Sequence, residues 1–196
     1  MSDHVGARAS RPHRGWHERG YLPHFDGGAA VETVTFRLAD SLPREFYEKA
    51  AAVAPNSIDL FYALEKAIDK GAGSCLLTLS TNAAIVRDAF AHFDGERYKL
   101  LAWVIMPNHV HVMIEQIEGH RLADVVQSWK SFTAHAINKV RGSNGSVWSP
   151  EYFDRYVRDE RHYENARYYI ENNPVKARLV GRPGDWPYSS ATVKST

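Results

Sequence analysis

The chain has 196 residues, 44% of them hydrophobic, and a formal net charge of +1, which fits one globular domain with a sizeable core. The single cysteine, Cys75, excludes an internal disulfide framework and favours a reducing, cytoplasmic location. The longest apolar runs, about eight residues, are too short to cross a bilayer, so no membrane contact is expected. Because the net charge is close to zero, any nucleic-acid-binding surface has to be local.

The first 28 residues differ in composition from the rest of the chain. They are rich in Arg, His and Gly, and Arg8, Arg11, Arg14 and Arg19 outnumber the acidic residues. This pattern predicts a basic, flexible arm that gains order by folding onto phosphate. The alternative is a plain disordered tail. Residues 29–196 are expected to form one domain.

Hydrophobic periodicity and turn residues predict the elements of that domain. We expect strands at 31–38, 98–106, 109–115 and near 147–157, and helices at 43–70 (broken near Pro55), 82–93, 122–140 and from 160 onward. If the helices within 43–70 are treated as an insertion, the order is strand–helix–strand–strand–helix–strand. That order predicts an α+β, ferredoxin-like split βαβ fold with an antiparallel sheet.

Two histidines follow a Pro-Asn turn signal inside the apolar segment 100–114. In a strand, residues i and i+2 project to the same face, so His109 and His111 should point together while Val110 faces the core. Two imidazoles held in this way can share one metal ion. The alternative is two polar positions on a half-solvated strand.

About sixty residues downstream of the histidines, Tyr169 and Asn173 lie one helical turn apart. Pro174 disfavours the helical conformation at Asn173, so the helix is expected to close there with a free amide oxygen. A phenol beside a neutral oxygen ligand is what a metal-assisted tyrosine nucleophile requires. The alternative is that Tyr169 packs in the core and Asn173 only caps the helix.

Together these segments resemble the single-tyrosine HUH (His-hydrophobic-His) transposases, in the branch of the REP-associated tyrosine transposases. The similarity follows the family's order over nearly the whole chain: GYLPH (20–24), TFRLADSLP (35–43), AWVIMPNHVH (102–111), SWKSFT (128–133), VWSPEYFDR (147–155), YIENNPVKA (169–177) and DWPYSS (185–190). Arg178 is a departure, because the family pattern has Gly after Lys-Ala. It affects only the local turn.

The resemblance implies an HUH transposase-like catalytic domain at 29–196, with the nucleophile Tyr169 on a C-terminal helix. His109, His111 and Asn173 would hold Mg²⁺ or Mn²⁺, and the product would be a 5′-phosphotyrosine. The implied partner is a single-stranded DNA hairpin of a palindromic repeat, bound by a monomer or homodimer. A free phenol has a pKa near 10, so only about one in a thousand is ionised at pH 7 and the metal is needed.

Other residues are weaker candidates. Tyr168 is the rival nucleophile, but it lies about 100° round the helix from Tyr169. Lys130, Arg155 and Arg158 are candidate DNA contacts, and ordinary solvated charge explains the two arginines equally well. Trp129 falls on the apolar stripe of its helix, so core packing is favoured over base stacking.

Two other functions fit the same residues. A domesticated relative would bind DNA hairpins without cleaving them, and it could lose the tyrosine or the histidines, all of which are present. An unrelated metal-dependent hydrolase would need a separate general base or a third, acidic ligand. Glu115 lies on the same strand face as the histidines, but several positions further along.

Overall fold

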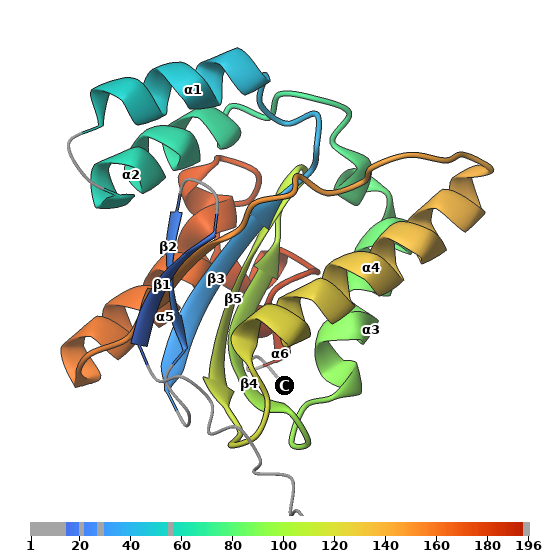
Figure 1. Cartoon of the computed structure of the whole chain (residues 1–196). Helices are drawn as coiled ribbons and strands as arrows, with labels where there is room; N and C mark the ends of the chain where they lie inside the picture. Colours follow the sequence, from blue (N-terminus) through green and yellow to red (C-terminus); the bar gives the residue numbers. More distant parts are fainter. Residues whose placement is uncertain (1–14, 20–21, 27–29, 55–56, 194–196) are drawn as a thin grey trace, which may run out of the picture.

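The computed structural model describes residues 15–19, 22–26, 30–54 and 57–193. Its centre is a four-stranded antiparallel sheet in the order β4-β5-β3-β6 (Figure 1). The strands are β3 (Val31–Arg37), β4 (Tyr98–Ile105), β5 (His109–Gln116) and β6 (Phe153–Tyr156). This order confirms the α+β, split βαβ prediction, because the hairpin strand β5 lies between β3 and β4.

Helices α3 (Ser80–His92) and α4 (Leu122–Arg141) cover one face of the sheet. The alternation of β3 and β5 sends Val34, Phe36, Val110 and Val112 into this main core. Trp129 of α4 is buried there, and its indole N–H donates to the hydroxyl of Tyr98 at 2.9 Å. Core packing, the favoured prediction for this tryptophan, is therefore confirmed.

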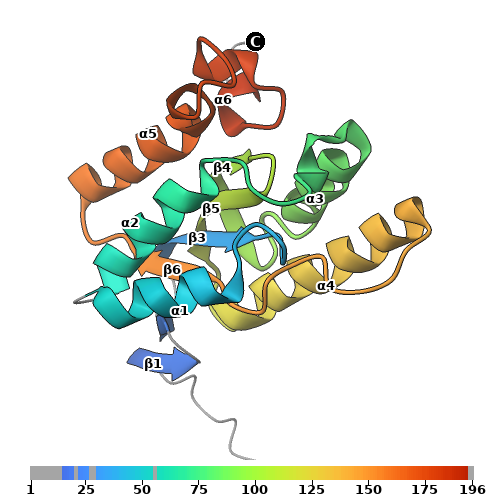
Figure 2. The same cartoon turned by 90° about the horizontal axis from the view of Figure 1, so that it is seen from above.

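Helices α5 (Glu160–Lys176) and α2 (Ser57–Ile68) lie on the opposite side of the sheet, and the inserted helix α1 (Arg44–Val53) packs against α2 (Figure 2). Ile170 of α5 packs against Val104 and Met113 of the sheet. Leu60, Leu64 and Ile68 of α2 form a separate apolar cluster, which Phe153 joins from β6. The predicted break within 43–70 separates α1 from α2, and residues 55–56 lie outside the described part of the chain.

The C-terminal segment closes the edge of the sheet at β4. It contains the short 3-10 helix η2 (Pro183–Asp185) and helix α6 (Ser190–Val193). The backbone N–H of Ile105 donates to the carbonyl of Tyr188, and Trp103 N–H donates to the Ser190 hydroxyl. These bonds satisfy backbone groups that an edge strand would leave unpaired. A further 3-10 helix, η1 (Leu76–Thr78), precedes α3.

Two predicted boundaries were wrong. Helix α5 continues three residues beyond Asn173, with Pro174 inside its last turn, where the missing proline N–H removes only one helical bond. The turn that follows places Arg178 at a φ of 59°, the left-handed region in which glycine is favoured, and this is where the family pattern has Gly. The strand expected near 147–157 is confined to Phe153–Tyr156, although Trp148 forms an isolated bridge with Leu38.

The region expected to be a flexible arm contains regular structure. Strands β1 (Gly15–Arg19) and β2 (Leu22–Asp26) pair as an antiparallel hairpin, and β2 lies beside β6. Arg19 ends β1, whereas Arg8, Arg11 and Arg14 lie outside the described residues. Across the described ranges, no helix is both long enough and apolar enough for a bilayer crossing.

Candidate metal and nucleophile site

The two histidines lie side by side at the start of β5. The turn before the strand is closed by a hydrogen bond from Met106 N–H to the carbonyl of His109. Both imidazoles are buried, and their Nε2 atoms are 3.1 Å apart. The two side chains thus converge on one point, as expected for residues i and i+2 of a strand.

Asn108 determines which nitrogen of His109 carries the proton. Its amide nitrogen donates to the carbonyls of Ile68 and Ala72 at 3.1 and 3.0 Å, which fixes the orientation of the amide. Its oxygen therefore faces Nδ1 of His109 at 2.8 Å and accepts from it. Burial lowers the pKa of His109 to about 3, so the ring is neutral at pH 7 and Nε2 keeps a free lone pair.

Three polar atoms crowd Nε2 of His111. They are Nε2 of His109 at 3.1 Å, Oε2 of Glu65 at 3.2 Å and Nδ2 of Asn173 at 3.2 Å. A single imidazole nitrogen has one lone pair or one proton and cannot satisfy three partners. On its other side, Nδ1 of His111 lies 2.8 Å from the hydroxyl of Thr35, which can donate or accept and so supports either tautomer.

Helix α5 brings Tyr169 and Asn173 to the histidines. The ring centroid of Tyr169 is 5.4 Å from that of His111, whereas Tyr168 is 69% exposed and points away. Asn173 is fully buried, and its Oδ1 has no hydrogen-bond partner. An unsatisfied buried amide oxygen is costly, so this atom indicates a missing partner at the site.

Glu65 of α2 is the site residue that no sequence pattern singled out. Its Oε2 accepts a hydrogen bond from the hydroxyl of Tyr169 at 2.5 Å and is 3.2 Å from Nε2 of His111. Burial alone would raise the pKa of Glu65, but its interactions with His111, His109 and the Tyr169 hydroxyl together lower the pKa to about 2. Burial and the Glu65 carboxylate together raise the pKa of Tyr169 well above its usual value. The phenol is therefore protonated here.

A second acidic residue lies directly after the end of α2, at the margin of the site. Asp69 pairs with Lys176 of α5 at 2.7 Å, and its other oxygen is 4.0 Å from Nε2 of His109. The ammonium of Lys176 is 5.1 Å from the ring centroid of Tyr169. The four-residue spacing of Glu65 and Asp69, about one helical turn, is the only sequence signal that could have pointed to them.

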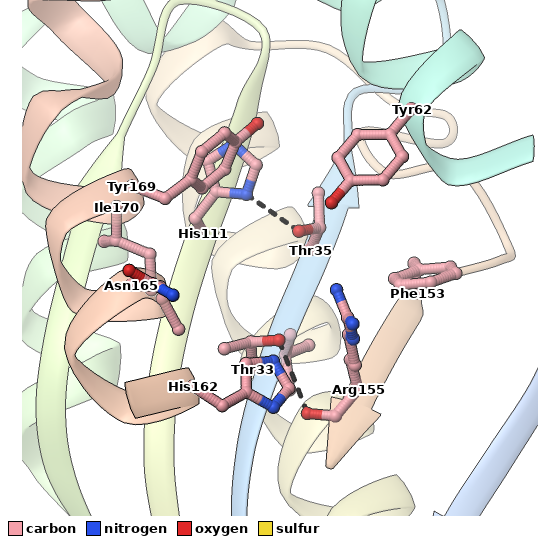
Figure 3. Close-up of a pocket in the computed structure, with 12 residues that line it drawn as sticks. Thr33, Thr35, Tyr62, His111, Phe153, Arg155, His162, Asn165, Tyr169 and Ile170 are labelled. Atoms are coloured by element: carbon pink, nitrogen blue, oxygen red, sulfur yellow. Dashed lines mark hydrogen bonds between the residues drawn. The ribbon is translucent and has the colours of Figure 1, made fainter. Parts of the chain in front are cut away.

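A pocket of about 280 Å³ opens beside Tyr169 (Figure 3). Its floor is the sheet, where Thr33 and Thr35 of β3 lie next to Phe153 and Arg155 of β6. Tyr62 of α2 and the face of α5 that carries Tyr169 form its walls; the remaining lining residues are Val34, His111, His162, Asn165, Ala166 and Ile170. Arg155, a candidate DNA contact, thus lines the same pocket as Tyr169, the candidate nucleophile.

The other candidates lie elsewhere. Lys130 is half-buried, its ammonium donates to the carbonyl of Pro150, and burial lowers its pKa to about 8. Arg158 is exposed beyond the end of β6. Glu115 pairs with Lys99 across the strands and takes no part in the site.

The side chains present fit a divalent cation. Two ligands bound at right angles at about 2.1 Å lie about 3.0 Å apart, close to the separation of the two histidine nitrogens. Glu65, His109 and His111 each offer a ligand atom, and these atoms lie within 4.8 Å of one another. Imidazole nitrogens with amide and carboxylate oxygens form a mixed donor set that suits Mg²⁺, Mn²⁺ or Zn²⁺.

Residues 84–173 match the family model described as "Transposase IS200 like". The chain is 27% identical to the REP-associated tyrosine transposase of Escherichia coli K12 over 113 residues, covering 57% of this chain and 66% of that protein. It is 26% identical over 103 residues to a Haemophilus influenzae protein described as "Putative REP-associated tyrosine transposase". This match covers 47% of this chain and 58% of that protein. The chain thus spans less than two thirds of each relative.

The fold is shared with a solved structure of a REP-associated tyrosine transposase bound to a REP hairpin. The TM-score is 0.60 at 22% identity, over 85% of this chain and 79% of the other. At this identity the likeness shows a shared fold. Residues 84–173 are similar to the IS200-like transposases, and the curated relatives that this chain resembles include REP-associated tyrosine transposases.

Proposed function

We propose that this chain is a metal-dependent DNA strand transferase that cleaves and rejoins single-stranded DNA at hairpins of palindromic repeats. The observation that carries the proposal is the position of the Tyr169 phenol against His111, with the unsatisfied oxygen of Asn173 one helical turn away. The family match and the hairpin-bound structural relative support the choice of substrate.

His109, His111 and Asn173 would hold Mg²⁺ or Mn²⁺. The amide of Asn173 has only to rotate by a half-turn to exchange its nitrogen for its free oxygen beside His111. When bound, the cation supplies charge that polarises the scissile phosphate. Asn108 keeps the lone pair of His109 directed at the same point.

The reaction is an exchange of phosphate esters. The Tyr169 oxygen forms a bond to phosphorus while the bond from phosphorus to the 3′ oxygen breaks. In the overall balance the phenol proton ends on that oxygen, which becomes a 3′-hydroxyl. The 5′ end stays on Tyr169 as a phosphotyrosine, so the ester bond is conserved for rejoining and no ATP is required.

The pocket beside Tyr169 provides a path for the DNA strand. Tyr62 and Phe153 offer aromatic surfaces on which a base can stack, and Arg155 offers a cation for a phosphate. Residues 29–196 would then be the catalytic domain, and the arginine-rich residues 1–28 would add contacts to the hairpin. Lys130 and Arg158 are weaker candidate contacts.

A metal-dependent hydrolase is the second candidate, because Glu65 supplies the acidic residue that this function requires. A cleavage assay on single-stranded hairpin DNA with and without Mg²⁺ separates the possibilities. The strand transferase gives a covalent protein–DNA adduct that needs metal. A hydrolase cleaves without an adduct, and a hairpin binder does neither.

A further inference from the structure

Glu65 reaches the histidines from α2, a helix outside residues 84–173, the part of the chain that matches the family model. Its carboxylate is almost completely buried, at 2% exposure. Among the contacts described for it, its partners are the His111 imidazole and the Tyr169 phenol. The nearby ammonium of Lys176 is paired with Asp69 instead.

A buried carboxylate is normally compensated by a cation or several donors. In a metal site both imidazoles are neutral, since each ligating nitrogen uses its lone pair. One phenol O–H would then remain as the donor to Glu65 among these partners. The buried Oδ1 of Asn173, an amide that also lies against Nε2 of His111, has no partner and independently points to the same missing cation.

We propose that Glu65 is an additional, anionic ligand of the divalent cation and that it also orients the nucleophile. This inference rests on the proposed function, because it assumes the metal site of His109, His111 and Asn173. The oxygen that lies 3.2 Å from His111 Nε2 is the one that accepts from Tyr169. One carboxylate thereby ties the position of the phenol to the metal. Helix α2 of the inserted pair thereby completes the site.

The test measures Mn²⁺ affinity by titration calorimetry on the full chain without DNA. Glu65→Gln keeps the shape of the side chain but removes its charge, and we expect it to weaken Mn²⁺ binding about 10-fold or more. The matched control is Asp59→Asn, the same loss of charge at an exposed position of the same helix, which should alter affinity less than about 3-fold. Tyr169→Phe should leave Mn²⁺ bound, because it removes the hydrogen bond and not the ligand.

The outcomes separate this inference from the proposed function. Unchanged Mn²⁺ affinity in Glu65→Gln, with affinity lost in His109→Ala, would overturn the role of Glu65 and keep the metal site. Unchanged affinity in both variants would overturn the metal site itself. An equal loss of Mn²⁺ affinity in Asp59→Asn and Glu65→Gln would mean that Glu65 acts only through the net charge of the protein, and would also overturn the ligand assignment. Thermal unfolding of each apo variant, followed by Mn²⁺-induced stabilisation, shows whether an affinity loss reflects misfolding.

Discussion

The Tyr169 hydroxyl donates to Oε2 of Glu65 at 2.5 Å, although 104 positions separate the two residues in the chain. The contact forms because α2 and α5 cover the same face of the sheet (Figure 2). It holds the phenol beside His111 and, together with burial, keeps it protonated. A tyrosine in this state is a poor nucleophile, which is why the proposed chemistry depends on a cation.

Tyr169→Phe should abolish cleavage while preserving the fold and hairpin affinity, because it removes one oxygen and little volume. Tyr168→Phe should retain substantial activity, since that side chain is 69% exposed and points away from the histidines. The measurement is a covalent adduct on a denaturing gel, formed with an oligonucleotide labelled 3′ of the nick.

Two results would contradict this assignment. An adduct that carries the fragment 5′ of the nick would mean 3′-phosphotyrosine chemistry. An adduct that persists in Tyr169→Phe and disappears in Tyr168→Phe would transfer the nucleophile to the neighbouring residue.

His109→Ala and His111→Ala should each eliminate metal-dependent cleavage and leave hairpin binding within about 3-fold, because the imidazoles act on the chemistry more than on docking. Calorimetry with Mn²⁺ and gel-shift titrations of the hairpin check the two halves separately. Normal Mn²⁺ affinity in the double variant would show that the ion binds elsewhere.

Asn108→Ala should weaken Mn²⁺ binding about 10- to 100-fold, because His109 loses the acceptor that fixes its tautomer and ring orientation. The carbonyls of Ile68 and Ala72 also lose their donor, so a lower melting temperature is expected. Asn138→Ala on α4 is the control, since that amide also donates to a backbone carbonyl but its helix lies on the other face of the sheet from α5. Equal Mn²⁺ affinity in both variants would argue against a role for Asn108 in the site.

Removal of residues 1–14 should lower hairpin affinity and its salt dependence and leave the cleavage step unchanged. The deletion takes out Arg8, Arg11 and Arg14 and spares the hairpin of β1 and β2. Each lost phosphate contact should reduce the slope of log affinity against log salt by about 0.7 on single strands. A slope equal to that of the full chain would make the segment a passive tail.

Arg155→Ala should weaken binding of single-stranded DNA, because its side chain lines the pocket next to Tyr169. Arg158→Ala, three residues further along and exposed, is the matched control. If both variants lose the same affinity, the pocket has no special part in holding the strand and the effect is one of overall charge.

Local periodicity in the sequence was sufficient to predict much of the fold and the two residue pairs that make up the proposed site. The period of two in a strand determined that His109 and His111 share a face, and the helical period determined that Tyr169 and Asn173 do. Both relationships act over a few residues, so neighbouring backbone geometry alone sets them. The order of strands and helices likewise limited the topology to a split βαβ sheet.

Only the tertiary structure decided which distant elements meet. Glu65 is one acidic residue on a helix with several polar positions, and it enters the site because Leu60, Leu64 and Ile68 anchor the apolar side of α2. Tertiary contacts also decided that α5 continues to Lys176. The helix packs against the sheet through Ile170 and ends in the turn at Arg178, and this offsets the hydrogen bond lost at Pro174. Such contacts depend on the burial of whole faces, which no local spacing in the sequence encodes.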